Sequence, residues 1–277
     1  MTRNQALQEL TEELYISYSQ IFTYLNCGLK YQFSYVEQRP AERVSVNLPF
    51  GLAIHKALER YYRSLKDANR TEPLALLQDL FAETLSHRLK NIPHPVIYKK
   101  EAPDEKSAIE MGKRLIQTFY ENIDLTGFRI VEVELPLSAK LYDENGQCTD
   151  FKLIGFLDLL LMDENGNLVA VDHKTAAKPY AQPSVDEDLQ LSSYSYLLAA
   201  NRFVTPKADI QCRLDVIRKL KKTPRLEHYH SVRNATDRRR FAKIATAVLA
   251  GIENRVFIPN RSWLCADCQY IDACKAW

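Results

Sequence analysis

The sequence predicts a mixed α/β fold, in which helices flank a central sheet. Three observations predict it: helical periodicity fills the first half of the chain, β-rich runs begin at Phe128, and one helical segment separates the first three of these runs from the last two. Elements in this order pack as helices against one sheet. We expect a single domain over residues 1–277, because no linker rich in Gly, Ser or Pro divides the chain.

The helical part is expected over residues 17–125. The stretch SYSQIFTYLNCGLKYQFSY (17–35) begins with serines suited to a helix N-cap and continues with apolar residues at helical spacing. The same period recurs in GLAIHKALERYYRSL (51–65) and near residues 72–89 and 104–123, with a loop at Pro93 and Pro95 between the last two. The polar first fifteen residues predict a further helix or a tail.

The sheet core is expected over residues 128–232. Its first three runs are FRIVEVELPLSAKLY, FKLIGFLDLLLM and LVAVDHKT, and an Asp-Glu-Asn-Gly turn follows each of the first two. Asn-Gly between apolar runs is a strong hairpin signal, so these strands predict an antiparallel meander. A helix over DEDLQLSSYSYLLAANRF and strands in ADIQCRLDVIRKL and RLEHYHSV follow. A last helix from about residue 234 leads into the cysteine-bearing tail, which ends the part 234–277.

The composition is that of an ordinary globular protein, with 46% hydrophobic and 26% charged residues. The net charge of +2 neither requires nor excludes a polyanionic partner, so a nucleic-acid site must come from local clusters of basic residues. No apolar run has the length of a bilayer span or the character of a signal peptide. We therefore expect a cytoplasmic protein with no membrane partner and with reduced thiols.

An acidic centre is expected within the meander. Asp158 interrupts an otherwise apolar strand, and a tight hairpin would bring it beside Asp172 on the next strand. Two adjacent carboxylates are compatible with a divalent cation between them, and oxygen ligands suit Mg²⁺ or Mn²⁺. Lys174 shares a strand face with Asp172 and could offset charge in a transition state. A purely structural Asp–Lys pair is the alternative, and His55 within an apolar helix could equally be a core residue.

Together these motifs resemble the PD-(D/E)XK nuclease superfamily, in particular its RecB-type, Cas4-like exonucleases. GLAIHKALE resembles the motif that supplies a metal-binding histidine, GFLDLLL the G-x-x-D strand, VAVDHKT the D-x-K signature, and DLQLSSYSYLL the Q-x-x-x-Y helix. The resemblance covers most of the chain and implies a restriction-endonuclease-like sheet flanked by helices. The order of the motifs is more specific than any one of them.

The resemblance also implies roles for individual residues. The implied metal ligands are His55, Asp158, Asp172 and the carbonyl of His173; the implied active-site residues are Asp158, Asp172, Lys174 as the catalytic lysine, Gln190 and Tyr194. Glu132 and Glu134 alternate on the neighbouring strand and could join an outer shell, although alternating Glu is common on exposed strands.

Three cysteines near the C-terminus, Cys265, Cys268 and Cys274, have the spacing of metal ligands, but a tetrahedral site or a cubane cluster needs a fourth thiolate. The resemblance implies that Cys27 is the fourth ligand and that the four hold a [4Fe–4S] cluster, joining the two ends of the chain. Zn²⁺ would accept the same thiolates and stays open from spacing alone. The remaining two, Cys148 and Cys212, lie singly in strand-like surroundings.

The resulting hypothesis is a Mg²⁺- or Mn²⁺-dependent DNA exonuclease that acts on single strands or DNA ends in repair, recombination or CRISPR adaptation. Basic residues would hold the DNA backbone: Arg218, Lys219, Lys221, Lys222, Arg225, Arg238, Arg239 and Arg240. Tyr31, Phe33 and Tyr35 could stack on bases or belong to the core. No phosphate-binding G-x-x-x-x-G-K-[ST] loop is present, so a separate helicase or adaptation-complex subunit would supply the strand. A non-catalytic, cluster-bearing scaffold is the alternative.

Overall fold

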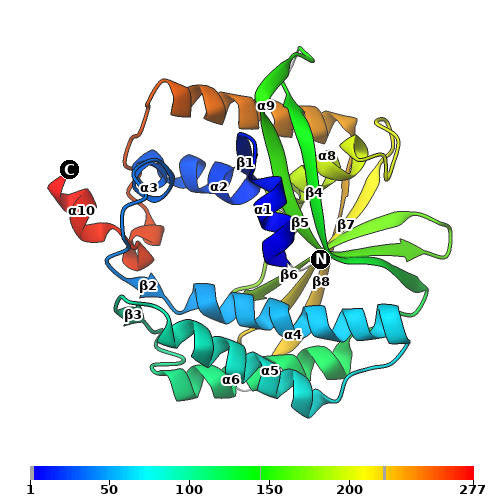
Figure 1. The fold of residues 1–277 in the computed structure, drawn as a ribbon. Helices are drawn as coiled ribbons and strands as arrows, with labels where there is room; N and C mark the ends of the chain where they lie inside the picture. The colour runs from blue at the N-terminus through cyan, green and yellow to red at the C-terminus, as the bar shows by residue number, and fades with distance from the viewer. Residues whose placement is uncertain (1–2, 144, 221–222) are drawn as a thin grey trace.

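The computed structural model describes residues 3–143, 145–220 and 223–277. Their centre is a six-stranded mixed sheet with helices on both faces (Figure 1). This is the mixed α/β architecture that the sequence predicts. None of the helices in these ranges combines the length and apolar character that a bilayer crossing needs.

The predicted meander is present. The strands β4 (Phe128–Tyr142), β5 (Cys148–Asp163) and β6 (Leu168–Ala176) pair antiparallel in chain order. The second connecting turn places Gly166 at a φ of +83°, a conformation that glycine adopts without steric cost. Because β5 is long, its other edge pairs with β6 along one half and with β1 (Tyr15–Ser17) along the other.

One crossover and one antiparallel edge strand complete the sheet. The strand β7 (Ile210–Arg218) pairs parallel to β6, and β8 (Arg225–Arg233) pairs antiparallel to β7 at the edge. The parallel pairing requires the crossover helices α7 (Gln182–Asp186) and α8 (Leu189–Ala200) between β6 and β7. The parallel edge strand β1 is not predicted by the sequence, because three residues are too short to show a period.

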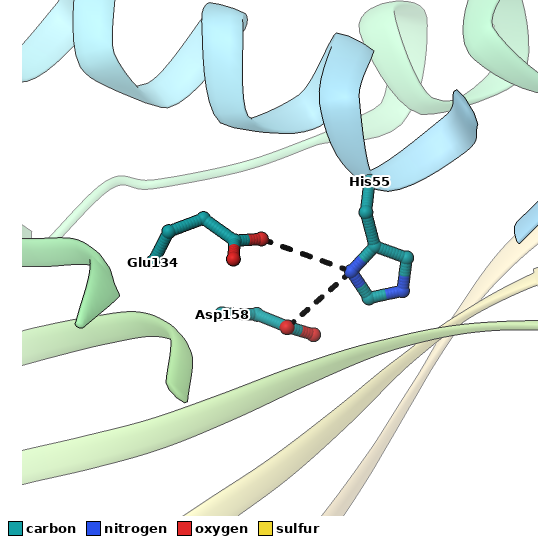
Figure 2. Close-up of side chains that lie close together, drawn as sticks. All are labelled: His55, Glu134 and Asp158. Carbon is teal, nitrogen blue, oxygen red and sulfur yellow. Dashed lines mark ion pairs between the residues drawn. The ribbon is translucent and has the colours of Figure 1, made fainter. Parts of the chain in front are cut away.

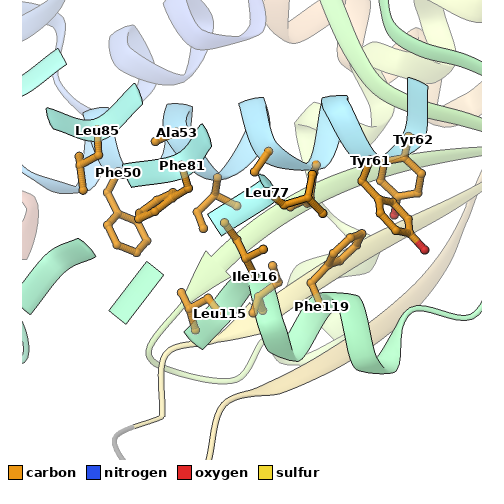
Figure 3. Packing of buried hydrophobic residues seen from close by; sticks show 14 of the residues in the cluster. Phe50, Ala53, Tyr61, Tyr62, Leu77, Phe81, Leu85, Leu115, Ile116 and Phe119 are labelled. Carbon is orange, nitrogen blue, oxygen red and sulfur yellow. The ribbon is translucent and has the colours of Figure 1, made fainter. Parts of the chain in front are cut away.

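One face of the sheet is covered by α4 (Asn47–Ala68), α5 (Leu74–Lys90) and α6 (Glu105–Asn122). Figure 3 shows the aromatic packing between these helices, where Phe50 meets Phe81 and Tyr61 meets Phe119 edge to face. Such pairs add about 0.5–1.5 kcal/mol each to the energy of burial. The apolar sequence period that predicts these helices is therefore the period of their buried face.

The opposite face is covered by α8 and by α9 (Ala235–Glu253), with α2 (Tyr18–Asn26) beside them. Here Leu160 and Ala170 of the sheet pack on the helices, whereas Leu159, Leu161 and Val171 face α4. The alternation along β5 and β6 thus points neighbouring residues into two separate cores. Residues next to each other in sequence can consequently take part in different sites.

The N-terminal segment departs from the sequence prediction. Instead of one helix over residues 17–35, the chain forms α2, the short α3 (Gly28–Tyr31) and the π-helix η1 (Gln32–Val36), after α1 (Arg3–Leu10). Ser17 caps α2 as predicted, but Cys27 is extended, with a φ of −166° and a ψ of 105°. Its thiol then caps α3 by accepting from the Lys30 N–H at 3.4 Å. The helix is broken at the residue that the sequence singles out as a ligand.

The C-terminal segment lies against the chain around residues 27–42. The C-terminal elements η2 (Trp263–Asp267) and α10 (Ile271–Ala276) lie beside α3 in Figure 1. Leu29 N–H donates to the Ile258 carbonyl at 3.3 Å, and Tyr270 packs on Phe33. The two-residue strands β2 (Val44–Ser45) and β3 (Val96–Ile97) form a separate small sheet nearby. Contacts between residues far apart in sequence thus hold the C-terminal segment against α3 and η1.

Candidate active site

Three carboxylates line up across the meander. The pairing of β5 with β6 ends at Leu159 and Val171, so Asp158 and Asp172 are the next residues along these strands. On the other edge of β5, Val133 pairs with Leu159 and Leu135 with Leu157, which sets Glu134 opposite Asp158. All three side chains are buried. The expectation that Asp158 and Asp172 lie on adjacent strands is therefore confirmed.

Glu134 is drawn inward by an irregularity in β4. The register shifts between Ile130 and Glu132, and Glu134 itself has a φ of +51°, which is rare for residues other than glycine. Glu132, two residues earlier, stays at the surface and pairs with Lys66 at 2.5 Å. The sequence shows only alternating glutamates and gives no sign of this kink, so it treats the two alike. The structure separates them.

His55 closes the acidic centre from above. It projects from α4 toward Glu134 and Asp158, as Figure 2 shows, with Nδ1 3.3 Å from Asp158 Oδ1 and 4.0 Å from Glu134 Oε1. In the described part of the chain, these three residues are the group whose metal-ligating atoms all lie within 4.8 Å of one another. Burial alone lowers the pKa of His55, but the surrounding carboxylates outweigh burial and raise that pKa to about 9. The His55 imidazolium thus supplies the positive charge beside the carboxylates that a bound cation would otherwise supply.

Asp172 belongs to a second group, on the face of β6 toward α8. Lys174 Nζ lies 2.8 Å from Asp172 Oδ2 and also donates to Gln190 Oε1 at 2.7 Å. Gln190 Nε2 donates to Asp172 Oδ1 at 2.8 Å, and the Tyr194 hydroxyl donates to the same oxygen at 3.1 Å. Burial, and then the charge of Asp158, raise the pKa of Asp172 despite the opposing effect of Lys174. The four residues that the sequence places together do lie together.

His173 points the other way, into the core beneath α4. Its backbone N–H donates to Asp158 Oδ2 at 2.8 Å, and its ring Nε2 lies 3.1 Å from the Tyr62 hydroxyl. Burial raises the pKa of Asp158, but His55 and His173 outweigh burial and hold that pKa well below its usual range. His173 therefore fixes Asp158 through its backbone, and a ligand role for its carbonyl stays a prediction.

One groove of about 570 Å³ is lined by residues of α2, α4, β5, β6 and α8. The site residues that line it are His55, Asp158, Asp172, Lys174, Gln190 and Tyr194. Tyr18 and Tyr35 line it as well, opposite the carboxylates. Tyr35 is exposed there, whereas Tyr31 and Phe33 are buried. Of the three aromatic residues considered for base stacking, two thus belong to the core, and Tyr35 alone reaches the groove.

The family model of the PD-(D/E)XK nuclease superfamily matches residues 15–275. This chain belongs to that superfamily. A crystal structure of a protein from Eubacterium rectale assigned as an exonuclease has a TM-score of 0.58 at 12% identity, covering 100% of this chain and 92% of the other. The crystal structure of SSO0001 has a TM-score of 0.38 at 17% identity, covering 90% and 92%. Curated proteins give no match.

The superfamily membership accounts for the arrangement of the sheet and its acidic centre. The Eubacterium rectale structure supports the fold, the restriction-endonuclease-like sheet flanked by helices, over the whole chain. A PD-(D/E)XK nuclease is expected to act on DNA with divalent metal ions. The carboxylate oxygens of Glu134 and Asp158 are donors that suit Mg²⁺ or Mn²⁺, and a ring nitrogen of His55 lies within reach of the same position.

Two of the arginines expected to hold DNA have internal roles in this nuclease-superfamily member. Arg218 is buried and its guanidinium pairs with Glu227 at 2.9 Å. Arg238 is buried and donates to Ser195 and to the carbonyls of Pro206 and Ala208. Their guanidinium groups already have partners and no access to a phosphate, so the predicted DNA contact is wrong for both. A run of basic letters does not reveal which members point inward.

The other basic residues differ among themselves. Arg225, Arg239 and Arg240 are exposed, and Lys219 is half-buried beneath the start of α4. Lys221 and Lys222 lie outside the described residues. The expectation of a DNA-backbone contact therefore stays a prediction for the exposed arginines and for Lys219.

All four predicted cluster cysteines line one cavity of about 340 Å³ between α2, α3 and the C-terminal segment: Cys27, Cys265, Cys268 and Cys274. Cys27 Sγ accepts from Asn260 N–H at 3.5 Å, and Cys265 Sγ accepts from Ser262 N–H at 3.4 Å. Burial raises the pKa of the Cys268 thiol. Within the described ranges, no three of these sulfurs are mutually as close as 4.8 Å. Of the remaining two, Cys212 is buried and Cys148 is exposed.

Proposed function

We propose that residues 1–277 form one metal-dependent nuclease domain that hydrolyses phosphodiester bonds in DNA, at single strands or ends, as a RecB-type, Cas4-like exonuclease does. The observation that carries the proposal is the row of carboxylates Glu134, Asp158 and Asp172 across three strands, with His55 above it and Lys174 beside it. Of these residues, Asp158, Asp172, His55 and Lys174 line one groove. A structural ion pair alone would not need a third buried acid and a histidine.

The side chains that would hold Mg²⁺ or Mn²⁺ are His55, Glu134 and Asp158, with Asp172 and the carbonyl of His173 completing the site. A divalent cation bound there lowers the pKa of a water molecule and offsets charge on the phosphate. The sequence suggests Glu134 only as an outer-shell residue, whereas this proposal makes it a direct metal ligand. The His173 N–H bond to Asp158 orients that carboxylate independently of the cation.

Lys174 acts at the edge of this group. Burial lowers the pKa of its ammonium, but Asp172 and Asp158 outweigh burial and raise it, so the amine stays charged at neutral pH. Gln190 bridges Lys174 and Asp172 and fixes the direction of the ammonium. A fixed positive charge beside the scissile phosphate stabilises the charge that develops there in the transition state. Tyr194 supports the same carboxylate from α8.

The cavity at the joined termini would hold a [4Fe–4S] cluster. Four thiols from both ends line it, and backbone N–H groups already donate to two of the sulfurs. A single zinc ion, with Zn–S bonds of about 2.3 Å, needs thiolates about 3.8 Å apart. The choice of a [4Fe–4S] cluster over zinc rests on the resemblance to the iron–sulfur members of the family, since zinc would accept the same four thiols. The cluster would fix the terminal helices to each other, and a separate helicase or adaptation-complex subunit would be the partner that supplies single strands.

The deciding experiment replaces the catalytic lysine. We expect Lys174→Ala to lower cleavage of end-labelled single-stranded DNA with Mn²⁺ by about 10²–10³-fold while its circular dichroism stays close to wild type. Its melting temperature should fall, because the buried Asp172 loses its cation. Lys178→Ala, an exposed lysine just beyond β6, is the matched control and should cleave normally. Equal cleavage by both variants would remove Lys174 from the mechanism. Wild-type protein that binds DNA but cleaves nothing with any divalent metal would favour the scaffold alternative.

A further inference from the structure

A second cavity adjoins the active-site groove at the carboxyl ends of β6 and β7. It has a volume of about 380 Å³, and its wall includes Asn47 and Phe50 of α4, Thr175 of β6 and Lys219 after β7. Asn47 also lines the active-site groove, and Thr175 directly follows Lys174 in the chain. The first turn of α4 is therefore the wall that the two cavities share. A strand leaving the groove past Asn47 would enter this cavity.

Lys99 and Glu101 line the same cavity as Lys219, but among the described residues Lys219 forms no ion pair there. Its Nζ lies 4.4 Å from the centre of the Phe50 ring, and no carboxylate within residues 3–143, 145–220 and 223–277 forms an ion pair with it. Burial, and then the nearby charge of Lys99, lower the pKa of Lys219 to about 8, while Glu101 acts weakly in the opposite direction. Lys99 itself is engaged by Asp267.

An amine in such surroundings lowers the stability of the folded protein, because it gives up hydration without gaining an opposite charge. A structural lysine would turn outward or pair, as Lys99 does. Perturbed cations in cavities beside an active site are typical of binding groups. An anion that enters beside Phe50 would supply the opposite charge to Lys219, with Asn47 and Thr175 as neutral donors and Lys99 and Glu101 on the same wall.

We propose that this cavity binds a phosphate group of the DNA strand adjacent to the one that is cleaved, with Lys219 as its cation. The inference rests on the proposed nuclease function and adds to it a fixed point for the strand outside the acidic centre. The phosphate is either an internal diester or a terminal monoester, since both present anionic oxygens to the ammonium. In either case Lys219 is a substrate-binding group, separate from the groups that act on the scissile bond.

The test compares Lys219→Met with Lys219→Arg and with Lys207→Met, an exposed lysine ahead of the opposite end of β7. For Lys219→Met we expect KM for single-stranded DNA to rise about tenfold with kcat within about twofold, the signature of lost binding that is equal in ground and transition states. Its melting temperature should not fall, because an unpaired buried charge is removed. Lys219→Arg should restore most of the affinity, and Lys207→Met should match wild type.

Substrate ends identify the phosphate. If Lys219→Met loses affinity only for oligonucleotides with a 5′- or 3′-terminal phosphate, the cavity holds a monoester; if the loss is equal for hydroxyl ends, it holds a diester. Inorganic phosphate should raise the melting temperature of wild type but not of Lys219→Met. This readout survives even if wild type proves unable to cleave DNA. An unchanged KM in an active Lys219→Met enzyme, or a melting temperature lowered by that substitution, would overturn the proposal.

Discussion

The acidic centre and the cysteine cavity are held in different ways. The carboxylates lie on paired strands between two large hydrophobic clusters, and the side chains around them bond one another directly. The cysteines lie on short elements around a cluster of only three buried residues, Leu29, Phe33 and Tyr270. Folding alone thus assembles the first site, whereas the second gains most from a ligand that joins its parts. We therefore expect a substitution that disables one site to leave the other site intact.

The largest effect is expected from Asp158→Asn in the acidic centre. The substitution removes the charge opposite His55 and one proposed metal ligand, so cleavage should fall by at least about 10²–10³-fold. Iron and sulfide content should equal wild type, because Asp158 does not line the cavity of the four cysteines. Single-turnover cleavage with Mn²⁺ and iron quantitation on the same preparation check both statements. Loss of iron together with cleavage would show that the sites are coupled.

The converse change is Cys27→Ser. We expect the anaerobically purified variant to lose its iron and sulfide and to melt about 5–10 °C lower, because a loop joining the ends of the chain is opened. Residual DNA cleavage should remain, since the sheet holds the acidic centre without the thiols. Cys148 is exposed and is not one of the four proposed ligands, so Cys148→Ser is the control and should keep its iron. A Cys27→Ser protein with full iron content would exclude Cys27 as a ligand.

The sequence predicts the acidic centre better than its surroundings, and the reason is geometric. Hairpin turns and alternation suffice to set Asp158 beside Asp172, because strand pairing is regular on both sides of a tight turn. Glu134 could not be ranked above Glu132, since the distinction arises from a register shift and one positive φ. Both features depend on tertiary packing that no local pattern encodes.

Contacts with distant residues also decide the structure at Cys27 and the burial of the basic residues. Helical spacing extends smoothly through Cys27, yet the chain breaks there, since the segment packs against the distant residues Phe257 and Ile258. A Cβ on the adjacent Gly28 would lie 3.0 Å from the Ile258 backbone nitrogen, which explains the small residue after the cysteine. Likewise, the burial of Arg218 and Arg238 is decided by partners 9 to 43 residues away along the chain.

A smaller effect separates buried from exposed arginines on α9. Arg238→Met should lower the free energy of unfolding by about 1–3 kcal/mol, because it leaves the buried Ser195 hydroxyl and two partly buried carbonyls without their donor. Its DNA affinity should be unchanged. Arg239→Gln with Arg240→Gln should leave stability unchanged and lower the slope of log affinity against log salt by about one per phosphate contact. Urea unfolding and DNA titration at several salt concentrations measure both. Unchanged stability together with a loss of DNA affinity in Arg238→Met would instead identify Arg238 as a DNA contact.

The smallest effect is a pH dependence at the boundary of the acidic centre. Below a pKa of about 8, Lys219 is charged in the free protein; above it, binding a phosphate must first protonate the amine. Affinity for single-stranded DNA, measured in EDTA to prevent cleavage, should therefore fall as pH rises through 8, approaching about tenfold per pH unit. Lys219→Arg stays charged and should remove this part of the profile, leaving contributions from His55 and other groups common to both proteins. Lys99 and Glu101 also face the amine, and both are unchanged in Lys219→Arg. Superimposable profiles for wild type and Lys219→Arg would mean that the amine meets no anion, and the strand would then be held by the acidic centre and the exposed arginines alone.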